Sequence, residues 1–299
     1  MGLLPKDLDI LPPSDDRVFK LILSPETSKP ILKDLISSII QRPVIEVEVR
    51  NSEIPPEDSQ EKAERLDVNC RIDDGSQIDL EMQASHIEEE NDGQHQNLKG
   101  KSVYYLCDLH SSQPSKGLQR YDKLARTYQV TFCSYTVFAE RGSYVNSFSM
   151  RHDEDNALLS DALHVVYVEL SKLKEIAAKS VDDMTDLEKW SIFFRYASER
   201  NYRETVNKVI ESKEALQMAG DILMNISQDE RERAVFRSRR MYRTDEQSNL
   251  ATARDNGRKE REVEIARNLL KINLALDQIA IATGLSIEEV EHLRIDEGG

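Results

Sequence analysis

Two neighbouring segments of the chain alternate apolar and polar side chains with a period of two. They span residues 65–72 and 77–83, and their apolar positions are Leu66, Val68, Cys70, Ile72, Ile78, Leu80 and Met82. This alternation is typical of half-buried strands, in which successive side chains point to opposite faces. The intervening Asp73-Asp74-Gly75 predicts a hairpin turn. The pattern therefore predicts a β-hairpin with one apolar face and one face of carboxylates and amides.

The pairing register of this hairpin follows from keeping one face apolar. A three-residue loop that ends at Gly75, as the left-handed bulge residue, pairs Val68 with Leu80. The same register places Asp67 directly opposite Glu81, with Cβ atoms roughly 5 Å apart. A two-residue loop would instead pair Val68 with Glu81 and mix apolar and charged side chains on one face. The first register therefore predicts two opposed carboxylates, whose repulsion a hard divalent cation would relieve.

The remaining sequence predicts a mixed αβ region followed by a helical one. Helices are expected at residues 17–23, 27–40 and 99–111, and strands at 44–49, 128–138, 144–150 and 163–169. Residues 1–14 contain several prolines and predict an N-terminal arm. From Leu170 onward the pattern is helical. Residues 227–256 are charged and contain no glycine, which predicts a long solvated helix or a linker.

Residues 263–294 predict a separate small unit. Gly284 separates two helices in it, and Ser286 is a good N-cap for the second. The unit resembles the helix-turn-helix tails of recombinases. Three acidic residues lie at the start of its second helix: Glu288, Glu289 and Glu291. Because carboxylates repel phosphate, they favour a contact with protein over a contact with DNA.

Composition narrows the class of protein. The 299 residues are 39% hydrophobic, which is typical of a soluble globular chain with one large domain or two smaller ones. No run of about 18 apolar residues is present, so no membrane span is expected. The first residues do not have the pattern of a signal peptide. Cys70, Cys107 and Cys133 show neither disulfide nor zinc spacing. A cytoplasmic location is therefore expected.

The net charge of −15 disfavours a protein that coats DNA with high affinity, since phosphate neutralisation needs Lys and Arg. The charge is uneven, however, and two stretches are basic. Their cations are Lys99, Lys101, Lys116, Arg120, Lys123, Arg126, Arg231, Arg233, Arg237, Arg239, Arg240 and Arg243. Local basic surface can coexist with a negative total, so a weaker contact with DNA is compatible with the sequence.

Several short motifs follow one another along most of the chain. They are Asp16-Arg17-Val18-Phe19-Lys20, Arg65-Leu66-Asp67-Val68, Leu80-Glu81-Met82-Gln83, Lys116-Gly117-Leu118-Gln119-Arg120-Tyr121-Asp122-Lys123-Leu124, Glu169-Leu170-Ser171-Lys172 and Trp190. In this order they resemble the PD-(D/E)xK nuclease superfamily, and more closely its recombination-promoting nuclease or transposase family. The resemblance implies an α/β fold with a restriction-endonuclease-like core, a small mixed β-sheet flanked by helices, followed by a helical C-terminal region. We therefore divide the chain into an arm (1–14), a nuclease-like domain (15–178), a helical extension (179–262) and a helix-turn-helix-like tail (263–299).

The resemblance also implies the chemistry of a Mg²⁺- or Mn²⁺-dependent DNA endonuclease. Asp67 and Glu81 would bind the metal, with the backbone carbonyl of Met82 as a third ligand. Gln83 would orient the attacking water. It stands where the superfamily usually has Lys, and a neutral amide cannot supply positive charge to the transition state. Electrostatic help would then come from the metal or from nearby Lys and Arg.

Further candidates for contacts with metal or substrate are Asp16, Lys20, Lys116 and Tyr121. Ordinary structural roles compete with these assignments. Asp16 is also a suitable helix N-cap, Lys20 an ordinary surface lysine, and Tyr121 a residue for which core packing is favoured. The polar hairpin residues have such an alternative too, because one face of an antiparallel hairpin commonly faces solvent.

Two other functions fit the sequence. A catalytically inactive nuclease fold could serve as an interaction module, which the negative charge and the absent Lys favour. A DNA-binding regulator could act through residues 263–299 alone. DNA is the partner expected of the nuclease and of the regulator, and the C-terminal helices are a candidate homodimer interface.

Overall fold

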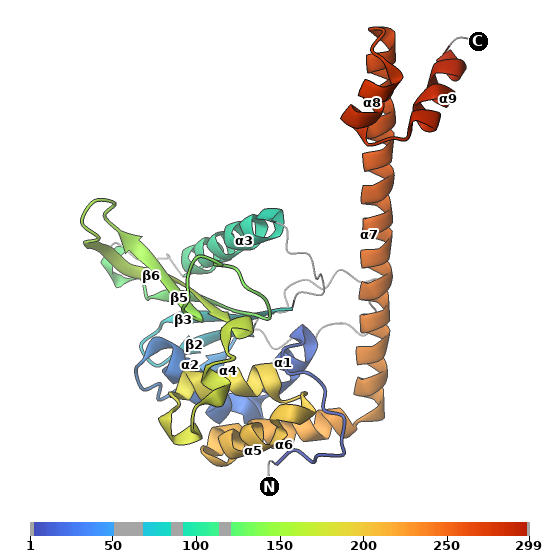
Figure 1. Ribbon diagram of the computed structural model, residues 1–299. Coiled ribbons are helices and arrows are strands. Elements are labelled where there is room, and N and C mark those ends of the chain that lie inside the picture. The colour runs from blue at the N-terminus through green and yellow to red at the C-terminus, as the bar shows by residue number, and fades with distance from the viewer. Residues whose placement is uncertain (1–2, 51–67, 85–91, 114–120, 298–299) are drawn as a thin grey trace. The chain divides into compact units, whose positions relative to one another are not determined.

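The computed structural model describes residues 3–50, 68–84, 92–113 and 121–297. Its centre is a six-stranded mixed sheet with the strand order β1-β2-β3-β4-β6-β5 (Figure 1). The strands are β1 (Val47–Val49), β2 (Val68–Ile72), β3 (Gln77–Gln83), β4 (Thr127–Cys133), β5 (Val145–Arg151) and β6 (Leu158–Glu169). The mixed sheet with flanking helices confirms the predicted restriction-endonuclease-like α/β fold, and β4 is shorter than the strand predicted at 128–138.

The helices are α1 (Asp16–Leu23), α2 (Lys29–Ile40), α3 (Asp92–Ser111), α4 (Asp186–Tyr196), α5 (Arg203–Glu211), α6 (Glu214–Gln228), α7 (Glu230–Lys271), α8 (Leu276–Thr283) and α9 (Ile287–Glu297). Asp15 caps α1, because its carboxylate accepts from the backbone N–H of Arg17 at 3.0 Å. Asp16 is therefore the first helical residue rather than the cap. None of the described helices is long and apolar enough to span a membrane.

The β2–β3 hairpin has the predicted register. Val68 pairs with Leu80, and Cys70 pairs with Ile78. The backbone N–H of Gly75 donates to the carbonyl of Ile72 at 2.8 Å, and Gly75 has a φ of 84°. A positive φ is accessible to glycine without a Cβ clash, which explains glycine at this bulge position. Asp67, the predicted partner of Glu81, lies outside the described residues.

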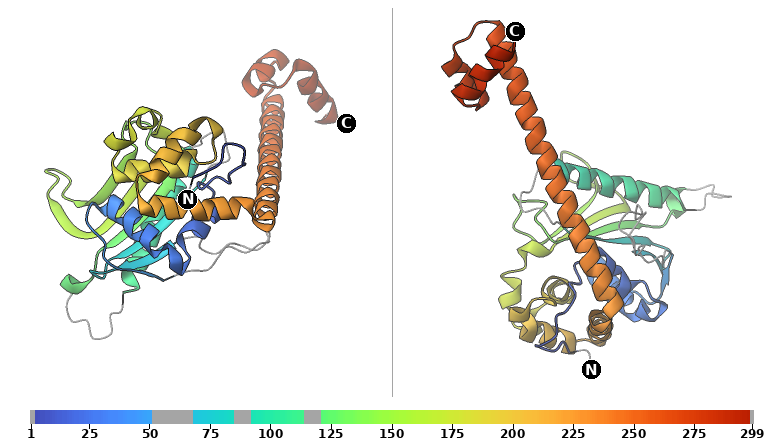
Figure 2. Two further views of the ribbon diagram at one scale, coloured as in Figure 1. Left: turned by 90° about the horizontal axis from the view of Figure 1, so that it is seen from below. Right: turned by 90° about the vertical axis from the view of Figure 1, so that its right-hand side faces the viewer.

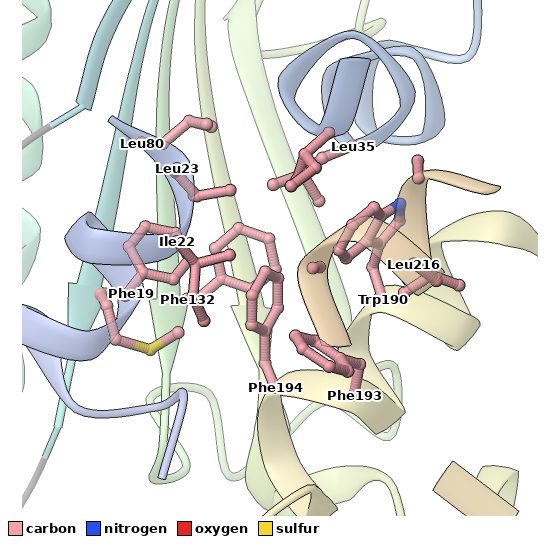
Figure 3. Packing of buried hydrophobic residues seen from close by; sticks show 14 of the residues in the cluster. Phe19, Ile22, Leu23, Leu35, Leu80, Phe132, Trp190, Phe193, Phe194 and Leu216 are labelled. Atoms are coloured by element: carbon pink, nitrogen blue, oxygen red, sulfur yellow. The ribbon is translucent and has the colours of Figure 1, made fainter. Parts of the chain in front are cut away.

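The main core lies between one face of the sheet and the helices α1, α2, α4, α5 and α6 (Figure 1). Three aromatic rings hold its centre: Phe19 of α1, Phe132 of β4 and Phe194 of α4 have centroids 5.2–5.8 Å apart (Figure 3). The indole N–H of Trp190 donates to Asp34 at 2.7 Å. This contact satisfies the polar atom of a buried tryptophan.

Helix α3 covers part of the opposite face of the sheet, and Figure 2 shows it in teal on the far side of the sheet from the blue and yellow helices. It connects β3 to β4, which run parallel. A smaller cluster forms beneath it from Leu98, Leu106, Cys133, Val137, Phe138, Val165 and Tyr167. The sheet is therefore covered on both faces, and β3 and β4 are central strands.

The chain divides into two compact units, Met1–Ser238 and Arg239–Gly299. In the second unit, the end of α7 packs with α8 and α9 around Ala266, Ile279, Leu285 and Val290. Gly284 ends α8 with a φ of 79°. Ser286 and Glu289 exchange two side-chain-to-backbone hydrogen bonds, which is a capping box. The predicted helix, glycine turn and helix are confirmed, and residues 227–256 are helical rather than a linker apart from the turn around Asp229.

Candidate functional site

Two carboxylates on the polar face of β3 are buried. Ile78, Leu80 and Met82 belong to the main core, so the alternate residues Asp79, Glu81 and Gln83 point to the opposite face. Asp79 is 3% exposed and Glu81 is 4% exposed. For Glu81, the alternative of an ordinary solvent-facing strand position is therefore wrong. A buried carboxylate needs a partner, because burial of an unpaired charge costs several kcal/mol.

Strand β4 extends this polar face sideways. Gln129 lies beside Asp79 and Thr131 beside Glu81 in the parallel pairing. Both β4 side chains are fully buried. Among the described residues, neither the amide of Gln129 nor the hydroxyl of Thr131 has a hydrogen-bond partner. Polar groups in protein interiors normally have hydrogen-bond partners. We therefore expect these polar side chains to form hydrogen bonds with solvent or with a bound ligand.

Glu81 receives a charged partner from α3. The ammonium of Lys101 donates a hydrogen bond to Oε1 of Glu81. Lys101 also lies 5.3 Å from the ring centroid of Tyr105, one helical turn further on. From the sequence, Lys101 was predicted only as part of a basic stretch. Lys101 follows the buried Leu98 by three residues, and residues i and i+3 share one face of a helix. This spacing could have predicted that Lys101 faces the sheet.

A third buried carboxylate in this layer has a structural role. Glu169, at the end of β6, accepts hydrogen bonds from the backbone N–H groups of Val137 and Phe138 at 2.5 and 2.9 Å. Its other oxygen accepts from Asn146 at 2.8 Å and from Lys172 at 2.7 Å. The Glu169-Leu170-Ser171-Lys172 motif therefore fixes the loop after β4.

Burial raises the pKa of the Cys133 thiol well above its usual value, and the negative charges of Glu169 and Glu81 raise it further. Burial also raises the pKa of Tyr167, the β6 neighbour of Thr131, to about 12. The thiol is therefore protonated near neutral pH and unsuited to nucleophilic attack.

Four further predicted site residues divide into three groups. Asp67 and Lys116 lie outside the described residues. Lys20 is 1% exposed, so the alternative of an ordinary surface lysine is wrong. Tyr121 is 89% exposed, so the favoured core-packing role is wrong as well.

The oxygen atoms on this polar face are of the types that bind a hard divalent cation. Glu81 offers a carboxylate, and Gln83 and Thr131 offer oxygens that have no hydrogen-bond partner within the described ranges. Oxygen donors of these types are the ligands that Mg²⁺ and Mn²⁺ prefer. The described residues contain no group of three His, Cys, Asp or Glu side chains that could hold a metal by themselves.

Comparison with known proteins identifies the family. A family model described as PD-(D/E)XK nuclease family transposase matches residues 13–253, which is 241 of the 299 residues. The match includes the β2–β3 hairpin, α3 and Glu169. No curated protein and no solved structure matches the chain.

Proposed function

Since the chain belongs to the PD-(D/E)XK nuclease family of transposases, we propose that it is a metal-dependent DNA endonuclease. It would hydrolyse phosphodiester bonds and thereby promote recombination or transposon-like mobility. The observation that supports this most is the buried carboxylate of Glu81 in a layer of buried oxygen donors on the central strands. A core that served stability alone would fill these positions with apolar side chains.

The proposed roles follow from the positions of the residues. Asp67 and Glu81 would hold Mg²⁺ or Mn²⁺, with the carbonyl of Met82 as the third ligand. When bound there, such an ion lowers the pKa of a water molecule and offsets the negative charge that develops on the phosphate. The amide of Gln83 would orient the attacking water by a hydrogen bond. Asp16, Lys20, Lys116 and Tyr121 remain candidates for contacts with the metal shell or with DNA.

One observation favours a second candidate, the catalytically inactive interaction module. The ammonium of Lys101 already neutralises Glu81, so the described carboxylate is compensated by protein alone. An inactive fold of this kind would keep the Lys101–Glu81 pair and bind no metal. The tail is proposed as a protein-contact unit, and as a candidate homodimer interface, because the exposed glutamates Glu288, Glu289 and Glu291 disfavour a contact with phosphate.

The test is nicking of supercoiled plasmid DNA in the presence of Mg²⁺, Mn²⁺ or EDTA. Wild type, Asp67→Ala and Glu81→Ala are compared, with Asp153→Ala as a control at an exposed carboxylate. We expect metal-dependent nicking that both site variants lose and the control keeps. Activity that survives in both site variants would place the reaction elsewhere. A folded wild type that neither cuts DNA nor binds metal in calorimetry would favour the interaction module.

A further inference from the structure

We propose that Lys101 of α3 is the cationic residue of the DNA cleavage site and that it compensates for the neutral Gln83 on β3. In this proposal, which rests on the endonuclease activity proposed above, the Lys101 ammonium has two alternative partners. It bonds to Glu81 in the metal-free protein, and it contacts the non-bridging oxygens of the scissile phosphate when metal and DNA are bound.

The position of the pair supports this exchange. Glu81 lies on a central strand and is almost fully buried, whereas the side chain of Lys101 is 33% exposed. The side chain of Lys101 is therefore partly in contact with solvent, while its ammonium bonds to the buried carboxylate. Its flexible four-carbon chain allows the ammonium to move by a few ångström without movement of the helix.

Two other lysines near this layer make contacts that differ from those of Lys101. Lys172 donates to the backbone carbonyls of Phe138 and Arg141 at 2.7 Å each, as well as to Glu169. These contacts fasten a loop. Lys99 lies on α3 two residues before Lys101 and packs its ammonium 4.8 Å from the ring centroid of Phe138. Lys101 alone of these three bonds to a carboxylate on the β3 face that carries Gln83.

The chemistry of hydrolysis explains why a cation is needed at this position. The oxygen of a water molecule forms a bond to phosphorus while the bond from phosphorus to the leaving oxygen breaks. The electron pair of that bond goes to the leaving oxygen, which takes a proton from solvent, and the attacking water loses a proton to solvent. Negative charge grows on the non-bridging oxygens during this step. A fixed ammonium stabilises it, whereas the amide of Gln83 provides only a dipole.

The first test measures cleavage of plasmid DNA by Lys101→Ala, Lys101→Arg and the double variant Gln83→Lys/Lys101→Ala. Lys174→Ala is the control, because it removes the same charge at an exposed position outside α3 and the β3 face. We expect Lys101→Ala to lose about 100-fold in rate, as is typical for removal of one transition-state contact. Lys101→Arg should retain part of the activity, and Gln83→Lys should restore a large part of it in the double variant. The control should cleave at a rate close to wild type.

The second test does not depend on cleavage. The binding of Mn²⁺ is measured by titration calorimetry in the absence of DNA. In wild type the ammonium competes with the cation for Glu81, so Lys101→Ala should bind Mn²⁺ roughly three- to fivefold more tightly, which is the effect expected of an ion pair worth up to ~1 kcal/mol. A purely structural lysine predicts the opposite, because its loss would disorder the carboxylate and weaken Mn²⁺ binding.

The outcomes separate the two proposals. Cleavage by wild type together with equal cleavage by Lys101→Ala would overturn the role of Lys101 and leave the endonuclease intact. Weaker or unchanged Mn²⁺ binding by Lys101→Ala would also overturn it. A wild type that does not cleave DNA with any metal would overturn both proposals. Loss of cleavage with tighter Mn²⁺ binding and rescue by Gln83→Lys is the result that the proposal requires.

Discussion

The two faces of the central sheet are both buried, yet they are built from different chemistry. Toward α1, α2 and α4 to α6, strands β3 and β4 present Leu80, Phe132 and their apolar neighbours, which pack against aromatic rings. Toward α3, the same strands present Asp79, Glu81, Gln129 and Thr131. One face gains stability from burial of apolar area. The other gives up stability to hold polar groups, which is the pattern expected of a functional site in a stable scaffold.

The largest effect is expected from truncation on the apolar face. Phe132→Ala removes the ring that contacts Phe19 and Phe194 and leaves a cavity in the centre of the core. We expect a loss of about 3–5 kcal/mol in the free energy of unfolding, measured by urea denaturation. Thr131→Val, one residue away on the opposite face, is the matched comparison and should change stability by less than ~1 kcal/mol. Equal losses of stability in Phe132→Ala and Thr131→Val would contradict the conclusion that the apolar face provides the stability.

An intermediate effect is expected at Glu169, the satisfied carboxylate of the polar layer. Glu169→Gln keeps the shape of the side chain but replaces the acceptor for Asn146 and Lys172 with an amide. Hydrogen bonds to a charged group contribute about 1.5–3 kcal/mol, so the free energy of unfolding should fall by about 2–3 kcal/mol. Urea denaturation measures this loss. Metal binding should be unaffected, because Glu169 is committed to the loop after β4, and calorimetry with Mn²⁺ provides the check.

The smallest of the three effects on stability, and the only increase, is expected at Gln129. Its amide is fully buried and has no hydrogen-bond partner among the residues that the structure describes. Gln129→Met conserves the shape of the side chain and removes its polar atoms. We therefore expect the free energy of unfolding, measured by thermal unfolding, to rise by about 1–2 kcal/mol. Gln113→Met is the control with the opposite sign, since the Gln113 amide exchanges two 2.9 Å hydrogen bonds with the backbone of Ala125. Destabilisation by Gln129→Met would mean that its amide has a structural partner.

The geometry of the hairpin was predictable from local sequence. Alternation with a period of two, together with Asp73-Asp74-Gly75, predicted the observed register of Val68 with Leu80 and the polar face of β3. The helix capping at Ser286 and the turn at Gly284 were predictable for the same reason. Each of these features depends on residues within a few positions of one another, so the backbone conformation follows from the local sequence.

The contacts of the polar face depend instead on long-range packing. The bond from Lys101 to Glu81 joins residues 20 positions apart on a helix and a strand, and it exists because α3 returns across the sheet between β3 and β4. The burial of Lys20, the exposure of Tyr121 and the structural role of Glu169 also depend on which elements pack together. A periodic pattern defines which side chains share a face. The elements that cover that face depend on long-range packing, which no local pattern encodes.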